Sequence, residues 1–274
     1  MGGGSGRSAG SGRAGHGATG EAGAVPVDPW GQQGYGVRFD WGPTGAARAD
    51  SRLGVLVVVD VLSFSTSVSV VVDRGGAVYP AAWRDARAQA LAREEDAVLA
   101  VGRREVTGEH PWSLSPAALR AAPVPARLVL PSPNGSAVAA AAAGVVVAAC
   151  LRNACAVADW LHPAYGTTRA PVTVVAAGER WPDGSLRPAL EDLLGAGAVL
   201  AAVQERGDAS LSPEAEAAAA AFRATASVPD TVHRCASGLE LAAGGFAGDV
   251  EVAVEVDVSP VVPLLRNRAF RAAG

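Results

Sequence analysis

The chain has 274 residues, of which 49% are hydrophobic and 18% are charged, with a formal net charge of −4. This length is enough to bury a sizeable core, and the charge gives no electrostatic footprint for nucleic acid or for an anionic membrane surface. Every basic side chain is Arg, so lysine chemistry is excluded and any anion site must use guanidinium groups.

The cysteines and the N-terminal sequence indicate the compartment. Cys150, Cys155 and Cys235 are odd in number and lack C-x-x-C spacing, which argues against a disulfide framework or a zinc site. The longest apolar run, 137–150, is alanine-rich and too short to span a bilayer. Residues 1–25 lack the apolar segment of a signal peptide. We therefore expect a cytoplasmic protein with neither a membrane nor a nucleic-acid partner.

The elements expected in chain order form one α/β domain behind a polar tail. Residues 1–34 are rich in Gly, Ser, Ala and Arg, and we expect them to be disordered. The G-x-G-x-x-G letters at 10–15 follow no strand and carry no weight. Within 35–274, strands are predicted at 36–40, 54–60, 76–80, 97–101, 127–131, 144–149, 171–176 and 250–258, and helices near 64–73, 83–94, 136–143, 152–162, 187–204, 213–223 and 231–243. This alternation predicts a three-layer α/β fold, a mostly parallel or mixed sheet flanked by helices.

The last predicted strand, 250–258, has a pattern of its own. Its valines recur at every second position, and its acids occupy the positions between them. This alternation is typical of a strand with one solvent-facing side, such as an antiparallel edge strand.

The first candidate site segment follows the apolar strand 54–60. Asp60 stands where this run gives way to hydroxyl-bearing residues, among them Ser65 and Thr66. Ligands of open α/β sheets bind outside the carboxyl ends of the strands, and an ionised carboxylate is costly to bury without a partner. This favours a functional Asp60 over the alternative, in which it ends the strand and caps the following helix.

The second segment is a strand, a proline-containing turn and Asn134-Gly135-Ser136 at the start of a helix. Backbone N–H groups at a helix start, with Asn and Ser side chains beside them, are suited to bind an anion. The alternative is that Asn134 or Ser136 is an ordinary N-cap. For Asn153, at a comparable junction, we favour plain capping.

The third segment presents Glu179 and Arg180 after a strand, followed by Glu191 and Asp192 in the first turn of a helix. Arg180 is suited to bind a phosphate or carboxylate bidentately, and Glu179 either binds a metal or pairs with Arg180. Acids are favoured near helix N-termini by the macrodipole alone. Because residues i and i+1 point in different directions, we expect at most one of Glu191 and Asp192 to face a site.

Several enzyme classes are disfavoured. The four histidines have no metal-ligand spacing, and there is neither a G-x-S-x-G motif nor a readable Cys/His pair. Phosphatases of the haloacid dehalogenase type need D-x-D-x-[TV], but Asp60 is followed by Val61 and Leu62. The remaining candidates are oxygen donors, which suit Mg²⁺.

Taken together, the segments resemble the 2-phosphosulfolactate phosphatase family. The matching motifs occur in family order over roughly 36–265, and several ordered motifs are more specific than any one of them. They are Asp60-Val61-Leu62, Asn134-Gly135-Ser136, Ala177-Gly178, Leu190-Glu191-Asp192-Leu193, Gly195-Ala196-Gly197-Ala198, Val256-Asp257 and Val262-Pro263.

The resemblance implies an enzyme that uses Mg²⁺ to hydrolyse a small anionic phosphomonoester, the phosphate on the 2-hydroxyl of a sulfonated lactate. It implies catalytic roles for Asp60, Asn134, Glu191 and Asp192, with Asp60 and Asp192 as metal ligands. The implied substrate-binding residues are Ser65, Thr66, Gly135, Ser136, Glu179 and Arg180, with Arg180 holding the sulfonate or carboxylate. The sequence leaves open whether the protein forms a homo-oligomer.

Three departures from the family pattern keep an alternative open. Ser63-Phe64 stands where the family carries Arg-Ala, Gly102-Arg103-Arg104 replaces G-E-R, and Leu114 lies in a segment that replaces L-G-N-S-P. These changes favour the alternative, a non-catalytic binding protein for a phosphorylated or sulfonated metabolite, whereas the retained acids and Asn134 favour the phosphatase. A dinucleotide oxidoreductase is disfavoured because no fingerprint follows strand 54–60.

Overall fold

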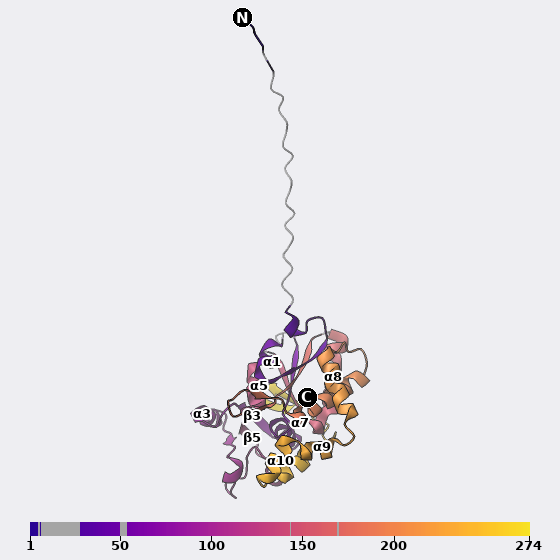
Figure 1. Cartoon of the computed structure of the whole chain (residues 1–274). Coiled ribbons are helices and arrows are strands. Elements are labelled where there is room, and N and C mark those ends of the chain that lie inside the picture. Colours follow the sequence, from indigo (N-terminus) through magenta and orange to yellow (C-terminus); the bar gives the residue numbers. More distant parts are fainter. Residues whose placement is uncertain (5, 7–27, 50–53, 143, 169) are drawn as a thin grey trace.

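The computed structural model describes residues 1–4, 6, 28–49, 54–142, 144–168 and 170–274. Most of the predicted disordered tail, 1–34, lies outside the described residues. The described residues build a nine-stranded sheet (Figure 1). Its strands, in spatial order, are β1 (Val37–Trp41), β7 (Val172–Ala176), β2 (Val55–Val59), β6 (Val145–Ala149), β10 (Pro263–Arg266), β11 (Ala269–Ala272), β3 (Ala77–Ala81), β5 (Arg127–Pro131) and β4 (Val98–Leu99). A small second sheet pairs β8 (Glu179–Arg180) with β9 (Leu186–Arg187).

Helices connect and cover the strands. They are α1 (Gly42–Arg48), α2 (Phe64–Asp73), α3 (Ala86–Glu94), α4 (Pro116–Ala121), α5 (Gly135–Ala141), α6 (Ala154–His162), α7 (Leu190–Glu205), α8 (Pro213–Ala224), α9 (Val228–Arg234), α10 (Ala236–Ala243) and α11 (Ala247–Ala253). Among the helices of the described ranges, none has the length and apolar content needed to cross a membrane.

The large sheet is mixed, and its antiparallel part lies in the middle. Strands β1, β7, β2 and β6 pair in parallel, as do β3, β5 and β4. The hairpin β10–β11 joins these two parallel groups by antiparallel pairing to β6 and β3. The predicted α/β class, a mixed sheet flanked by helices, is confirmed.

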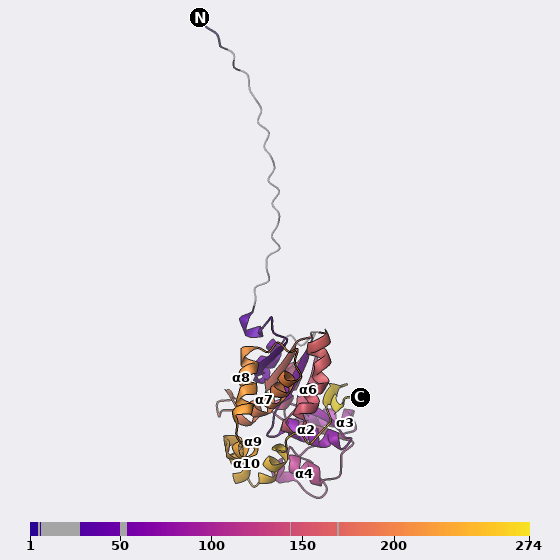
Figure 2. The same ribbon diagram turned by 90° about the vertical axis from the view of Figure 1, so that its right-hand side faces the viewer.

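Helices cover both faces because the central strands are apolar on both sides. Along β2, Val57 and Val59 belong to a core that includes residues of α6, α7 and α8. Leu56 and Val58 point the other way, into a core with α1, α2 and α5, as the period-two geometry of a strand requires. Figure 1 shows α1 and α5 on one side of the sheet and α8 on the other, and Figure 2 shows α6, α7 and α8 over one face.

The main error of the sequence prediction is the strand at 250–258. Residues 247–253 instead form α11, because Val250 and Ala253, three residues apart on one helix face, are both fully buried. Val256 and Val258 are exposed, at 39% and 55%. The antiparallel pairing lies further on, in β10 and β11, which were not predicted; neither were the short helices α1 and α4.

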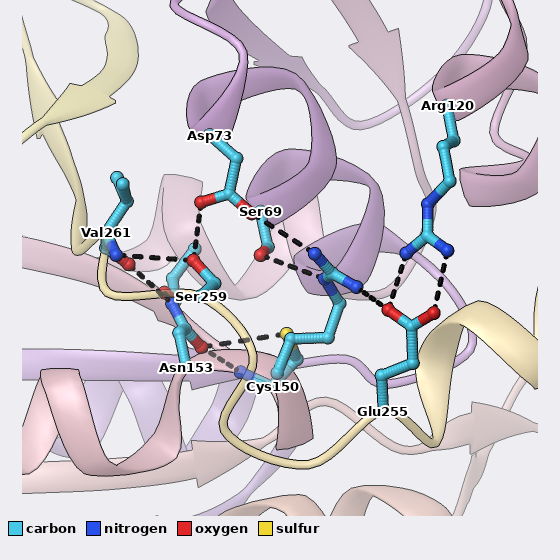
Figure 3. A network of polar contacts seen from close by, with 10 residues as sticks. Ser69, Asp73, Arg120, Cys150, Asn153, Glu255, Ser259 and Val261 are labelled. Atoms are coloured by element: carbon cyan, nitrogen blue, oxygen red, sulfur yellow. Dashed lines mark hydrogen bonds and ion pairs between the residues drawn. The ribbon is translucent and has the colours of Figure 1, made fainter.

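An ionic network explains the path of the segment after α11 (Figure 3). Arg152, only 6% exposed, donates hydrogen bonds to Ser69 (3.3 Å) and Asp73 (3.1 Å), and it forms an ion pair with Glu255. Glu255 also accepts from Arg120 at 2.7 Å. Glu255, predicted to face solvent from a strand, therefore ties this segment to α4 through Arg120 and to α2 through Arg152.

Asn153 lies at the N-cap position of α6, but its side chain makes no capping bond to that helix. Its Oδ1 accepts the Cys150 N–H at 2.9 Å, and its Nδ2 donates to the carbonyls of Ala148 and Val261. Asn153 therefore caps the short 3-10 turn at 151–153 instead of α6, and its side chain also joins β6 to the C-terminal segment.

Candidate active site

Asp60 directly follows β2 and is only 4% exposed. Its Oδ1 accepts the backbone N–H of Phe64 at 2.9 Å, and its Oδ2 accepts that of Gly135 at 2.8 Å. The carboxylate therefore joins the start of α2 to the start of α5, two helices that follow different strands. Both partners favour its charged form, since N–H groups at helix starts carry positive partial charge.

Ser65 and Thr66, predicted to bind substrate, are buried in the turn that holds Asp60. The Ser65 hydroxyl donates to the Val58 carbonyl at 3.1 Å, and the Thr66 hydroxyl donates to the Val61 carbonyl at 2.7 Å. Their protons are thus used inside the turn. In this arrangement the two hydroxyls shape the end of β2 rather than face a ligand.

Asn134 points toward the third segment. Its side chain makes no capping bond to α5; its Nδ2 donates to Glu179 Oε2 at 2.9 Å. The alternative of ordinary capping therefore does not apply to Asn134. Ser136 is buried, and its hydroxyl donates to the Leu130 carbonyl at 3.4 Å.

Gly135 lies where no side chain fits. A Cβ atom there would stand 2.5 Å from Phe64 Cδ1 and 2.7 Å from Asp60 Oδ2. The missing side chain lets the backbone of α5 approach Asp60 closely enough to donate its hydrogen bond.

Asp192, in the first turn of α7, joins two strand ends. Its Oδ1 accepts the Val61 N–H at 2.7 Å and its Oδ2 accepts the Gly178 N–H at 2.9 Å. Glu191 is also buried and accepts the thiol proton of Cys235 at a Sγ–Oε2 distance of 3.2 Å. The two acids thus point to different partners, because the turns after β2 and β7 and the start of α10 surround the start of α7.

The acidic cluster, defined as Asp60, Glu179, Glu191 and Asp192, is electrostatically crowded. Burial raises the pKa of Asp60, and the charge of Glu191 adds to the rise. Burial, followed by the charges of Asp60 and Glu191, raises the pKa of Asp192 well above its usual value. Burial and then the charge of Asp60 raise the pKa of Glu179 to about 7. Like charges held together away from water disfavour ionisation.

Cys235 stays protonated beside this cluster. Burial, assisted by the charge of Glu191, raises the pKa of its thiol to about 12. At neutral pH the thiol is therefore a hydrogen-bond donor to Glu191 and not a nucleophile.

Two arginines that were not assigned roles from the sequence supply positive charge to the cluster. The charge of Arg187 lowers the pKa of Glu179, and that of Arg103 lowers the pKa of Asp60, against the larger effects of burial. The predicted anion ligand, Arg180, is exposed and donates to the carbonyls of Gly184 and Pro133. The signal for Arg103 was its place in the departure Gly102-Arg103-Arg104; Arg187 carried no local signal.

The side chains of the site differ in their exposure to solvent. Asp60, Glu191 and Asp192 are buried, whereas Glu179 is only partly buried. Asn134, Arg103 and Arg187 share this intermediate exposure. Solvent therefore reaches these four side chains but not the three buried acids.

The donors of the site suit a hard cation, although no metal cage is preformed. Within the described ranges, no three or more His, Cys, Asp or Glu side chains are arranged to hold a metal ion. The predicted ligands Asp60 and Asp192 accept a backbone N–H at each carboxylate oxygen. Mg²⁺ in proteins is held by one or two carboxylates, with water and substrate phosphate completing the shell. The carboxylates of Glu179 and Glu191 fit this pattern, since each accepts a side-chain donor at Oε2 alone among the described contacts.

Parallel strands that carry acidic groups to one edge of a helix-covered sheet define an α/β enzyme, and comparison with known proteins identifies it as a phosphomonoester hydrolase. The family model described as 2-phosphosulpholactate phosphatase matches residues 44–268. The chain therefore belongs to the 2-phosphosulfolactate phosphatase family, which confirms the resemblance drawn from its motifs.

A curated relative supports the same assignment. The chain is 28% identical over 220 residues to the 2-phosphosulfolactate phosphatase of Methanothermobacter thermautotrophicus, an alignment that covers 78% of this chain and 88% of the relative. The alignment therefore spans most of both proteins.

Proposed function

We propose that the protein hydrolyses 2-phosphosulfolactate, or a closely similar phosphorylated hydroxy acid, to the hydroxy acid and inorganic phosphate in a Mg²⁺-dependent reaction. The family and the relative's name support the phosphatase activity. The observation that supports the metal dependence is the gathering of four carboxylates at one edge of the sheet, where burial and then the charges of neighbouring acids raise the pKa of Asp60, Glu179 and Asp192. A divalent cation relieves this repulsion.

In this proposal Glu179 and Glu191 hold the metal. Bound Mg²⁺ would neutralise charge on the phosphoryl oxygens and lower the pKa of a coordinated water. Asn134 fixes Glu179 through the hydrogen bond from Nδ2 to Oε2. Asp60 and Asp192, the ligands predicted from the sequence, brace the turns that carry these groups, since each of their oxygens accepts a backbone N–H.

The partly buried side chains bind the substrate. Arg187 stacks on Trp181, with Cζ 5.8 Å from the ring centroid, and donates to Ser237 at 3.2 Å, so its guanidinium is held in place. Because its charge acts on Glu179, Arg187 is suited to stabilise the negative charge of the phosphoryl group bound there. Asn134 offers its amide at the same edge.

The proposed setting is the cytoplasm. Its support is chemical: the three cysteines are free thiols, as is usual in a reducing compartment.

The test is phosphate release from 2-phosphosulfolactate with Mg²⁺, with EDTA, and with Mg²⁺ restored after EDTA. Glu191→Gln, which keeps the shape of the side chain but removes its charge, should abolish most of the Mg²⁺-dependent rate. Glu216→Gln, an exposed change on α8, is the matched control. Equal rates in EDTA and Mg²⁺ would exclude the metal; a folded protein inactive on phosphorylated hydroxy acids would favour the binding-protein alternative.

A further inference from the structure

Arg103 reaches the site from a distant loop. It lies in a short 3-10 turn at 103–105, after β4, and its Nη2 donates to the Ser63 hydroxyl at 2.8 Å. Ser63 immediately precedes α2 and stands three residues after Asp60. The hydrogen bond to Ser63 therefore holds the guanidinium at the turn that carries Asp60.

Buried groups hold Arg103 in this position. Its Nε donates to Asp249 Oδ2 at 3.0 Å, and the side chain of Asp249 is 1% exposed. The other oxygen of Asp249 accepts the Ser115 hydroxyl and the Ala117 N–H, the latter at 3.2 Å. Asp249 cannot turn away without leaving these donors unpaired, which is costly for buried groups. The Arg103 side chain is therefore pre-organised by its partner.

An aromatic ring also contacts the guanidinium. Arg103 Cζ lies 5.7 Å from the centroid of Phe246, within the range of a cation–π contact. The Arg103 side chain keeps 22% of its surface exposed. Within the described part of the chain, its hydrogen bonds use Nε and Nη2, and Nη1 makes none. Among the described contacts, Nη1 thus remains a donor available to a ligand.

We propose that Arg103 is the specificity-determining residue that binds the second acidic group of the substrate, a carboxylate or sulfonate separate from the phosphate. This inference rests on the proposed function. The two guanidiniums then divide the work: Arg187 lies with Glu179, where the phosphate binds, and Arg103 lies with Asp60 and Ser63, where the other end of a small substrate reaches. A guanidinium fork matches the oxygens of a carboxylate or sulfonate.

The alternative is that Arg103 only neutralises Asp249. The first experiment separates the two roles with Arg103→Gln and the control Arg104→Gln, an exposed arginine in the same turn. Steady-state rates are compared for 2-phosphosulfolactate and for isopropyl phosphate, which has no second acidic group. The loss of one charged hydrogen bond should raise KM for 2-phosphosulfolactate about 10- to 100-fold and leave kcat/KM for isopropyl phosphate unchanged. An equal loss on both substrates, or no loss, would overturn the proposal.

A second measurement does not depend on turnover. Binding of sulfolactate, which carries the carboxylate and sulfonate but no phosphate, is measured by calorimetry for the same proteins. Weaker binding by Arg103→Gln, but not by Arg104→Gln, supports the proposal even if the wild type hydrolyses nothing, an outcome that would contradict the proposed function alone. Absence of sulfolactate binding by the wild type would overturn the assignment of Arg103.

A third variant controls for loss of stability, because Arg103→Gln removes the charged partner of the buried Asp249. The double variant Arg103→Gln/Asp249→Asn removes both charges. If Arg103 binds the substrate, this protein should fold stably and still bind sulfolactate about 10- to 100-fold more weakly than the wild type. Restoration of both stability and affinity would show that Arg103 serves only Asp249.

Discussion

The replacement Glu179→Gln tests the electrostatics of the acidic cluster most directly. In the folded protein the pKa of Glu179 rises from 4.5 to about 7 because of burial and the charge of Asp60. Between these two pH values the folded state binds a proton that the unfolded state has released. The free energy of unfolding therefore has its full contribution from Glu179 below pH 4.5 and loses it as the pH rises to about 7.

The loss amounts to roughly 3 kcal/mol at most, since one pH unit corresponds to ~1.4 kcal/mol, and partial exposure of Glu179 reduces it. Glutamine is neutral at every pH and still accepts the Asn134 hydrogen bond. Without metal, Glu179→Gln should therefore match the wild type in stability near pH 4.5 and exceed it by 1 to 3 kcal/mol, as an order of magnitude, at pH 8.

The assay is urea unfolding in EDTA between pH 4.5 and pH 8. The proteins compared are the wild type, Glu179→Gln and the exposed control Glu216→Gln. A stability difference between Glu179→Gln and the wild type that stays constant over this range would refute the reasoning, because only an ionisation can make it depend on pH. So would a variant that becomes relatively less stable as the pH rises.

Three further predictions follow from the same contacts. In thermal unfolding, Gly135→Ala should destabilise the protein by about 2 kcal/mol or more, since its Cβ would clash with Phe64 and Asp60. The control Gly248→Ala, whose Cβ has ordinary contacts, should be neutral or stabilising. Asn134→Ala removes a hydrogen bond that lowers the pKa of Glu179, so the acid limb of its pH–rate profile should move to higher pH; an unmoved limb contradicts this coupling. Mg²⁺ at 100 times its Kd should stabilise the wild type by about 3 kcal/mol. The stabilisation at a fixed Mg²⁺ concentration should be larger at pH 8 than at pH 5, because protons compete with the metal for the carboxylates. Equal stabilisation at both pH values would count against carboxylate ligands.

Much of the fold could be predicted because its signals are local. The apolar runs that became β2, β6 and β7 end within a residue or two of their predicted limits, and α2 occupies 64–73 as expected. The exception, 250–258, shows the limit of periodicity. Val250 and Val254 satisfy the helical spacing as well as the alternation of a strand, and packing on neighbouring helices decided between them.

The site was predicted in part. The position of Asp60 and of the Gly178-Glu179 turn followed from the sequence, because β2 and β7 are parallel and their carboxyl ends lie at one edge. The roles of Ser65 and Thr66 did not, since a hydroxyl binds backbone or ligand equally well and the sequence does not show which partner is near.

Most of the elements, the acids at the strand ends and the family followed from residue type and spacing, because these act over short distances along the chain. Which side chains meet depended on the folded arrangement of these elements. Asp60 accepts a hydrogen bond from Gly135 although four strands separate β2 from β5 in the sheet, and Arg103 reaches Ser63 from a loop after β4. Such contacts depend on strand order and on helix crossings, which are set by the burial of the whole core and not by any local pattern.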